Sequence, residues 1–434
     1  MPLEITPSEV RRALATLQQR DGRAADDARA AIDALTLRDS DDDPVVVARY
    51  TLQRFLWYEL PHKWLAPVDE LREVAAALAA FFEEVGASRY AEICRSADTD
   101  RMIATDGDGF IELMEASGLE PPDCALLEWG GLMTVDEAEV RDEASRFLED
   151  AIDRGMLVPG ASGWQERQQD LMERFLTTAD MGEAPLTLIR RARIEQWVGH
   201  PTNAARRAVL GPLVPQLEGP APDDHHAGRA IEPLLWLLER LDAGVELTQT
   251  GAFSRRFVQE AVTRYPNWWQ SDLFDPPTRE AEVFPLEVLH DAVLGLRLTR
   301  RRGRTLYATK RAGQVRDQPT VLLAAVMAGL AGAEEPARGG LDVTLALLLR
   351  DPPLAGDDLL RRLSELVPVP AMIADEERLI EILPDVVLGH AASVLAPFDG
   401  IAQRGKAPTL TESGRLLAIE ILRARATGPG GLFW

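Results

Sequence analysis

Residues 297–309 read Arg-Leu-Thr-Arg-Arg-Arg-Gly-Arg-Thr-Leu-Tyr-Ala-Thr, and this stretch decides the fold of the C-terminal half of the chain. Apolar and polar residues alternate in Arg297–Arg300 and again in Arg304–Thr309, as they do in strands that bury one face. Gly303 stands between the two runs, where a tight turn favours glycine. The stretch therefore predicts a two-stranded hairpin with a basic tip.

The residues before this hairpin predict one more strand and two helices. Val245–Thr248 has the composition of a short strand, and both Gly251–Arg264 and Thr278–Leu296 have the pattern of a helix. The predicted order is therefore strand, helix, helix and hairpin, in a module that covers residues 244–318.

This order resembles the winged helix-turn-helix superfamily. The resemblance is carried by Leu247-Thr248-x-x-Gly251, by the two helices and by Leu298–Arg304. A weaker resemblance to the same superfamily follows in residues 319–434, where a helical segment precedes Phe398-Asp399-Gly400 and then Leu410-Thr411-x-x-Gly414-Arg415. The resemblance implies one or two small winged-helix (α+β) modules in the C-terminal half. The whole chain is also similar to a bacterial protein group, a resemblance that implies no particular role.

The N-terminal part predicts helices. Thr6-Pro7-Ser8-Glu9 and Thr134-Val135-Asp136-Glu137 are capping boxes, which start helices. Val45–Leu60 and Val68–Val85 predict buried helices. Residues 1–160 are therefore predicted to form an acidic, all-helical domain.

A helical connecting segment is predicted at residues 161–243, with a linker near 211–227, where proline and glycine are frequent. With the all-helical N-terminal domain and the small modules that follow, the predicted fold class is mainly α.

The charge of the chain is uneven. The formal net charge is -23, and the first 150 residues hold 33 acidic and 15 basic residues against 37 and 32 in the rest. The N-terminal part repels polyanions at long range, so a nucleic-acid contact would have to come from the remainder. Solubility is the ordinary explanation of an acidic surface.

The cysteine count, the first residues and the longest apolar stretch predict a cytoplasmic protein. The chain has only two cysteines, which excludes a disulfide framework and fits a reducing compartment. The first residues show no basic stretch followed by an apolar run, so no signal peptide is expected. The longest apolar stretch, Val321–Ala333, is shorter than the roughly 20 residues of a spanning helix, so no membrane partner is expected.

Two motifs could suggest a metal. Asp106–Glu115 resembles the second part of an EF-hand loop, but its first ligand position is occupied by Ala104, so an acidic turn before a helix is favoured. His225 and His226 are adjacent, and adjacent side chains point in different directions, so a solvated linker is favoured there. No catalytic signature occurs either. We therefore expect no metal site, no cofactor and no catalytic residue, although an enzyme with an unrecognised site stays an alternative.

Tyr265-Pro266-Asn267-Trp268-Trp269 places three aromatic residues between the two predicted helices of the module. Exposed aromatic residues of this kind can stack on a base or on a partner side chain. Buried tryptophans also dominate the energetics of small cores, and we favour this second explanation.

The basic hairpin is the strongest candidate for a binding site. Residues 297–316 hold eight basic residues and no acidic one. The candidate nucleic-acid or partner-binding residues are Arg297, Arg300, Arg301, Arg302, Arg304, Lys310 and Arg311. The helix before the hairpin carries four acidic residues, which disfavours its insertion beside phosphates.

Three alternatives follow from this cluster. In the first, the chain is a non-enzymatic regulatory or adaptor protein whose basic wing touches a nucleic-acid backbone. In the second, the modules are packing units of a protein-interaction scaffold, and the wing meets an acidic protein surface. In the third, the wing is a solvated surface.

Overall fold

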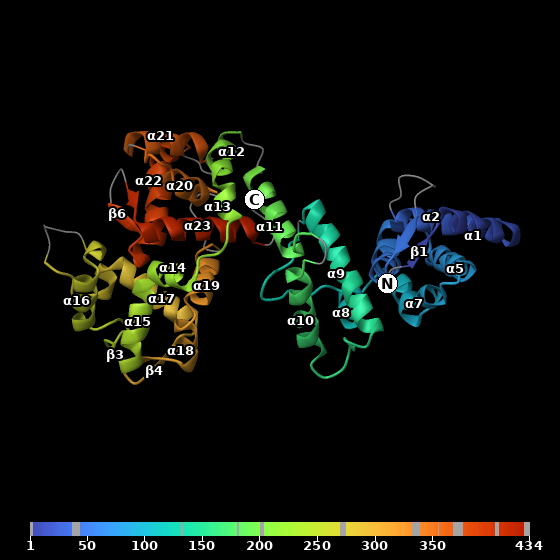
Figure 1. Ribbon diagram of the computed structural model, residues 1–434, viewed down its shortest axis with the longest axis horizontal. Coiled ribbons are helices and arrows are strands. Elements are labelled where there is room, and N and C mark those ends of the chain that lie inside the picture. The colour runs from blue at the N-terminus through green and yellow to red at the C-terminus, as the bar shows by residue number, and fades with distance from the viewer. Residues whose placement is uncertain are drawn as a thin grey trace. The chain divides into compact units, whose positions relative to one another are not determined.

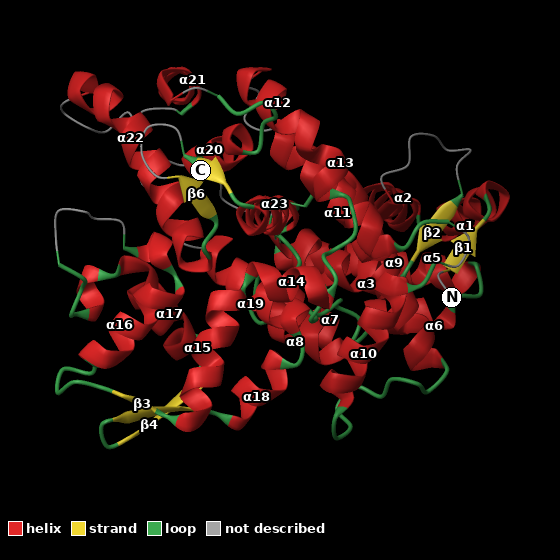
Figure 2. Ribbon diagram, turned by 60° about the vertical axis from the view of Figure 1, so that its left-hand side comes forward, coloured by secondary structure: helices red, strands yellow, loops and turns green. Residues whose placement is uncertain are grey.

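The computed structural model is mainly helical, which confirms the predicted fold class at this level (Figures 1 and 2). It divides into two compact units, residues 1–189 and 190–434. The finer domain boundaries at 160, 243 and 318 stay predictions. The structure describes residues 3–36, 44–131, 133–179, 182–199, 204–269, 275–331, 339–354, 356–367, 376–403 and 408–428. Within these ranges, no helix is long and apolar enough to cross a bilayer.

The first unit consists of helices and one small sheet. One of its hydrophobic cores is made of residues between Ile5 and Leu119, and a smaller one of residues between Leu127 and Ile189. Its elements are β1 (Leu3–Ile5), α1 (Pro7–Arg20), α2 (Gly22–Thr36), β2 (Val45–Val47), α3 (Arg49–Arg54), the π-helical turn η1 (Phe55–Glu59), α4 (Leu60–Lys63), α5 (Val68–Glu84), α6 (Ser88–Cys94), α7 (Ala97–Ala104), α8 (Phe110–Ser117), α9 (Val135–Asp153) and α10 (Trp164–Thr177).

The two helix starts predicted from caps in this unit are confirmed, with a reciprocal capping box at the first of them. The Thr6 hydroxyl accepts a hydrogen bond from Glu9 N, and the Glu9 carboxylate accepts one from Thr6 N at 2.9 Å, so the reciprocal box starts α1. Thr134 starts α9 by accepting a hydrogen bond from Glu137 N at 3.0 Å. Both helices therefore begin where their caps predict.

The prediction that residues 1–160 are all-helical is wrong at one place. β1 and β2 form an antiparallel pair in which Leu3 faces Val47 and Ile5 faces Val45. The predicted helix at 45–60 therefore begins only at Arg49. Three consecutive valines favour a strand because their branched side chains restrict χ1, and a short buried run has no period that separates strand from helix.

The second unit holds the predicted module. Its elements are α11 (Pro185–Gly199), which spans the boundary, α12 (Ala204–Leu210), η2 (Gly211–Leu213), α13 (Val214–Leu217), α14 (Asp224–Ala230), α15 (Glu232–Ala243), β3 (Val245–Glu246), α16 (Arg255–Arg264), η3 (Pro266–Trp268), η4 (Glu280–Glu282), α17 (Phe284–Gly295), β4 (Thr299–Arg302), β5 (Thr305–Ala308), α18 (Lys310–Arg316), α19 (Pro319–Ala331), α20 (Gly340–Leu348), α21 (Gly356–Leu366), α22 (Glu376–Leu395), η5 (Ala396–Phe398), β6 (Ile401–Gln403), β7 (Thr409–Leu410) and α23 (Glu412–Thr427).

The predicted strand and hairpin are present and form one sheet. The strand order is β3-β5-β4, with antiparallel neighbours, so β5 is central and β4 lies at an edge. Both views show this sheet beside α15 and α18 (Figures 1 and 2).

The two helices of the module are shorter than predicted. α16 begins at Arg255, because the backbone turns before it at Gly251, whose φ is +93°. The predicted helix 278–296 is a 3-10 turn, η4, followed by α17, which has Pro285 in its first turn. A proline is tolerated there because the first helical amides have no partner within the helix.

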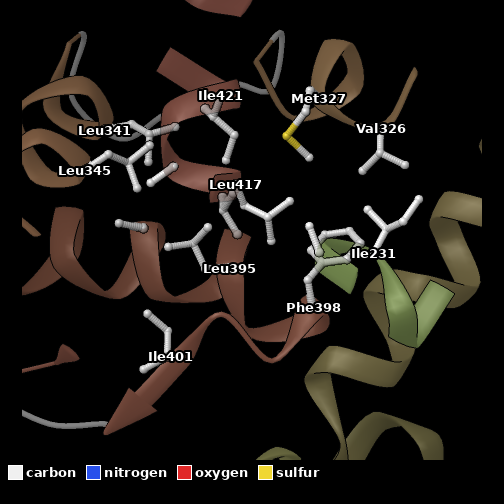
Figure 3. Close-up of a cluster of buried hydrophobic side chains, with 14 of the residues drawn as sticks. Ile231, Val326, Met327, Leu341, Leu345, Leu395, Phe398, Ile401, Leu417 and Ile421 are labelled. Atoms are coloured by element: carbon white, nitrogen blue, oxygen red, sulfur yellow. The ribbon is translucent and has the colours of Figure 1, made fainter. Parts of the chain in front are cut away.

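The core of the second unit is continuous from Ile194 to Ala426. In Figure 3, Ile231 at the start of α15 lies in the same cluster as Phe398 of η5 and Leu417 of α23. The strand–helix–helix–hairpin segment therefore shares its core with the C-terminal helices.

The segment predicted to be a linker, 211–227, is packed. It contains η2, α13 and the start of α14, and Leu217 and Ala227 are buried. The Arg423 guanidinium donates to the carbonyl oxygens of Gln216 and Leu217 at 2.8 and 2.9 Å. The apolar side chains and these hydrogen bonds outweigh the local preference of proline and glycine for turns.

The two Leu-Thr-x-x-Gly motifs have different structures. Thr248 and Gly251 lie in a turn between β3 and α16, where glycine permits the positive φ. Thr411 instead caps α23, and its hydroxyl accepts a hydrogen bond from Gly414 N at 3.0 Å. Gly414 packs directly on Gly400, where a Cβ would lie 1.9 Å from the Gly400 carbonyl oxygen. The second glycine is therefore needed for close backbone approach.

Candidate binding surface

The turn of the basic hairpin is built by Gly303. Arg302 pairs with Thr305, which leaves Gly303 and Arg304 as a two-residue turn between the strands. Gly303 has a φ of +61°, as the first position of a type II′ turn requires, and Arg304 has a negative φ. Arg301 Nε donates to the Gly303 carbonyl oxygen at 2.9 Å, and Arg304 Nε donates to that of Leu247 at 3.3 Å. The tip is thus a defined turn.

Strand register divides the arginines between the two faces of the sheet. Arg301 is opposite Leu306, which is buried, and so belongs to the inner face at the open edge. Arg300 is opposite Tyr307, and Arg302 is opposite Thr305, on the outer face. Tyr307 lies against Gly244, where an added Cβ would be 2.5 Å from Cε1 of the ring. The outer face therefore carries two arginines beside one positioned aromatic ring.

The seven predicted cations are all exposed: Arg297, Arg300, Arg301, Arg302, Arg304, Lys310 and Arg311. Within the described ranges, none of them forms a salt bridge, whereas neighbouring arginines do. Arg264 contacts Glu232 at 2.6 Å, Arg240 contacts Glu260 at 2.8 Å, and Arg316 contacts Asp242. In a chain of net charge -23, the hairpin is therefore a surface of uncompensated positive charge.

Lys310 and Arg311 begin α18, directly after β5. The Thr309 hydroxyl caps this helix by accepting a hydrogen bond from Ala312 N at 3.3 Å. Cations at a helix N-terminus face the positive end of the helix dipole, so their positions are not explained by helix stability. They extend the positive surface of the hairpin.

The helix before the hairpin has a different chemical character. Glu287 and Asp291 of α17 are exposed, and so are Phe284 and Leu294, at 47% and 49%. These residues share one helix face because they are three or four positions apart. This face is acidic and apolar, so it does not suit insertion into a groove between phosphates.

Arg255 and Arg256 are a part of the surface that the sequence analysis did not single out. Both are exposed at the start of α16, and no described carboxylate forms a salt bridge with them. Arg301 connects the hairpin to this region, since its Nη1 lies 3.6 Å from the position of a Cβ on Gly251, four residues before α16. The available signal was the pair Arg255-Arg256 itself, at the start of the helix that follows β3.

The aromatic loop belongs to the core, as predicted. Trp268 is 2% exposed and stacks on Tyr265 with ring centroids 4.4 Å apart. Trp269 is half-buried. The interpretation of this loop as an exposed stacking platform is therefore wrong for Trp268.

A buried acid–base pair holds the module together beneath the surface. Glu280 accepts a hydrogen bond from Phe253 N at 2.5 Å and pairs with His290 Nδ1 at 2.6 Å. The His290 ring stacks on Phe253, with centroids 4.1 Å apart. The pair thereby links the turn before α16 to α17.

The possible metal motifs have other roles. Asp223 caps α14 by accepting a hydrogen bond from His226 N at 2.9 Å, and its hydrogen bonds with His226 lower the pKa of Asp223. At Asp106–Glu115, a turn with left-handed Asp106 and Gly109 leads into α8. No group of three histidine, cysteine or acidic side chains in the described part of the chain is arranged to hold a metal ion.

Comparison with known proteins concerns this same region. Residues 231–321 match the model of a family described as the Y4jL N-terminal domain. No curated protein and no solved structure matches the chain. The matched segment runs from the start of α15 into α19, and it contains the sheet and all seven cations.

Proposed function

We propose that the chain is a non-enzymatic regulatory or adaptor protein that binds a nucleic-acid backbone through its basic hairpin. The observation that carries the proposal is the set of seven exposed cations without a salt bridge to any described carboxylate, beside arginines that do have one. Guanidinium groups suit phosphates because their planar donors can bind two oxygens at once.

The segment 244–318 is, in this proposal, a winged-helix module with β4 and β5 as its wing, and α15 precedes it. Supporting this, β3, α16, α17 and the hairpin follow in the order of such modules, and the strand order β3-β5-β4 puts the wing beside the first strand. The contact is made by the wing and by the start of α16, because the exposed face of α17 carries Glu287 and Asp291.

Binding of this kind is indifferent to base sequence. Base edges are read by an element that enters a groove, and the exposed acidic face of α17 disfavours such an insertion, so the cations of the hairpin are left to contact phosphates. Each strand of the hairpin has four residues, or about 13 Å. One strand of a duplex has a phosphate about every 3.4 Å along the helix axis, so about four phosphates of that strand lie within this axial length.

The test is fluorescence anisotropy with a labelled random-sequence duplex at low salt. Changing Arg301, Arg302 and Arg304 together to Glu is expected to abolish binding. A second variant, Arg300→Glu with Arg302→Glu, keeps the two hydrogen bonds of the turn and is expected to weaken binding strongly. The matched control changes three exposed arginines of the first unit to Glu: Arg12, Arg167 and Arg174.

The control has the same net charge as the triple hairpin variant, so it separates a local contact from general charge. Equal loss of binding in both variants would leave the hairpin without a specific role. Unchanged binding by a folded hairpin variant would remove the wing from the mechanism.

The second candidate is a protein-interaction scaffold, and α17 gives it a specific basis. Phe284 and Leu294 expose apolar surface beside Glu287 and Asp291, a combination that suits a protein partner better than phosphates. This alternative predicts no DNA binding at low salt. It also predicts that Phe284→Ser with Leu294→Ser changes self-association or a protein contact.

A further inference from the structure

The first unit contains a cleft that none of the preceding roles uses. It has a volume of about 1180 Å³ and lies between α8, the loop before α9, and the start of α10. Small-molecule sites usually have about 300–1,000 Å³, so this cleft is large enough for a segment of peptide. Its lining combines carboxylates with two tryptophans: Glu112, Glu115, Asp123, Trp129, Trp164 and Glu166.

We propose that this cleft binds an extended peptide that carries arginine or lysine side chains. The proposal goes beyond the role of the hairpin and does not depend on it, because the two lie in different units of the chain. It rests on the cavity and its tryptophans, with the charge of the walls defining the chemistry of the ligand.

The walls of the cleft are fixed by hydrogen bonds. The buried Gln168 of α10 donates from Nε2 to the carbonyl oxygens of Gly118 and Glu120, at 3.0 and 2.9 Å. Trp129 Nε1 donates to the Pro122 carbonyl oxygen at 3.3 Å. The loop that follows α8 is therefore tied to α10, and the cleft exists before a ligand binds.

The two tryptophans supply flat surfaces at defined positions. Trp129 and Trp164 are both half-buried and pack against the smaller core of the first unit. Asp123 accepts a hydrogen bond from Trp129 N at 2.9 Å, which holds the backbone of that loop. Guanidinium and ammonium groups bind over indole faces more strongly than over other aromatic rings.

Three carboxylates in the cleft have no cationic partner among the described residues. Glu112 and Glu115 are exposed on one face of α8, three positions apart, and Glu166 is exposed in the first turn of α10. The one arginine in the lining, Arg141, is already engaged by Glu120. These three groups are therefore available to pair with the cations of a ligand.

The spacing of the carboxylates favours a peptide over a metal ion. No three acidic, histidine or cysteine side chains of the described ranges are placed to hold one ion, so these carboxylates do not converge. Separate negative charges along a cleft fit separate positive charges along an extended chain. The two tryptophans then cover the aliphatic parts of the same side chains.

The experiment titrates the full chain with a fluorescein-labelled hexa-arginine peptide at physiological salt. Changing Glu112, Glu115 and Glu166 together to Gln is expected to weaken binding about tenfold or more, since each exposed ion pair contributes modestly. The matched control changes to Gln three exposed carboxylates outside the cleft, Glu70, Glu92 and Glu143. This control is expected to bind the peptide almost as tightly as the parent does.

A second pair of variants separates the cleft from general charge attraction. Trp129→Leu and Trp164→Leu leave the net charge unchanged, and each is expected to weaken binding about five- to thirtyfold through the lost cation–π contact. Thermal unfolding checks that each variant is folded. If a tryptophan variant does not fold, the variant with Glu112, Glu115 and Glu166 changed to Gln tests the proposal in its place.

Three results would overturn the proposal. Equal weakening in the two glutamine variants would mean attraction to the acidic surface as a whole. Unchanged affinity in both tryptophan variants, if folded, would exclude the cleft. Spermidine binding with the same affinity and the same loss in the cleft variant would mean that the ligand is a small polycation.

Discussion

Substitution of Gly414 by Ala tests the packing of α23 on Gly400, the residue before β6. A Cβ on this residue would lie 1.9 Å from the carbonyl oxygen, 2.7 Å from the carbonyl carbon and 2.9 Å from the Cα of Gly400. All three atoms belong to backbone, so no side chain can move aside. The start of α23 and residue 400 would have to separate by roughly 1.5 Å to reach an ordinary contact.

That separation would also break hydrogen bonds. Thr411 N donates to the Gly400 carbonyl oxygen at 3.0 Å, and the Thr411 hydroxyl donates to that of Asp399 at 3.0 Å. Overpacking costs about 1–3 kcal/mol, and each lost hydrogen bond about 0.5–1.5 kcal/mol. We therefore expect the free energy of unfolding of the second unit to fall by about 2–6 kcal/mol.

The assay is scanning calorimetry, in which 1 kcal/mol shifts the Tm by about 2–4 °C for a unit of this size. The control is Gly389→Ala, because Gly389 is exposed within α22 and an added Cβ there would have no neighbouring atom within 4 Å. Alanine in a helix interior is favoured by about 1 kcal/mol, so this variant is expected to unfold at a slightly higher temperature. Equal small shifts of the same sign in both variants would refute the close approach of Gly400 and Gly414.

Three further outcomes are expected. Trp268→Ala is expected to lower the free energy of unfolding by about 3–5 kcal/mol, measured by denaturant titration, and Trp269→Ala by clearly less, because only Trp268 is fully buried. The Tm is expected to be the same in millimolar calcium as in millimolar magnesium, because the loop Asp106–Glu115 lacks its first ligand. A rise of the Tm with calcium alone would show calcium binding. Burial, and to a lesser degree Arg425, lowers the pKa of His390, so the unfolded chain binds more protons and stability is expected to fall as pH drops below about 6.5; a folded His390→Gln variant with the same pH slope of its Tm would contradict this assignment.

Local signals predicted the hairpin well and the lengths of its neighbours poorly. The alternation in residues 297–309 and the glycine at 303 predict both strands and the turn, because all the deciding contacts are within the hairpin. The start of α16 was misplaced because Gly251 belongs to a turn that the sheet determines. Val45–Val47 was misassigned because its strand partner, Leu3–Ile5, is about 40 residues away in the sequence.

The candidate site was likewise predicted only where local sequence determines it. Exposure of Arg300, Arg301, Arg302 and Arg304 follows from their place at the edge and tip of the hairpin, which the sequence pattern indicates. Arg255 and Arg256 were missed because their place beside the hairpin depends on how β3 pairs with β5. The cleft beside Trp129 and Trp164 was also missed, since it forms between segments that only tertiary packing brings together.

The salt dependence of duplex DNA binding measures how many phosphates the hairpin neutralises. If the hairpin neutralises about four phosphates, the slope of log K against log salt concentration is about -3 to -4, at about -0.9 per phosphate. Replacing Arg301, Arg302 and Arg304 by Glu is expected to remove about 2.7 from the magnitude of that slope, while the control at Arg12, Arg167 and Arg174 keeps it. A slope that stays the same in the folded hairpin variant, or no measurable binding by the parent at about 50 mM salt, would contradict the account.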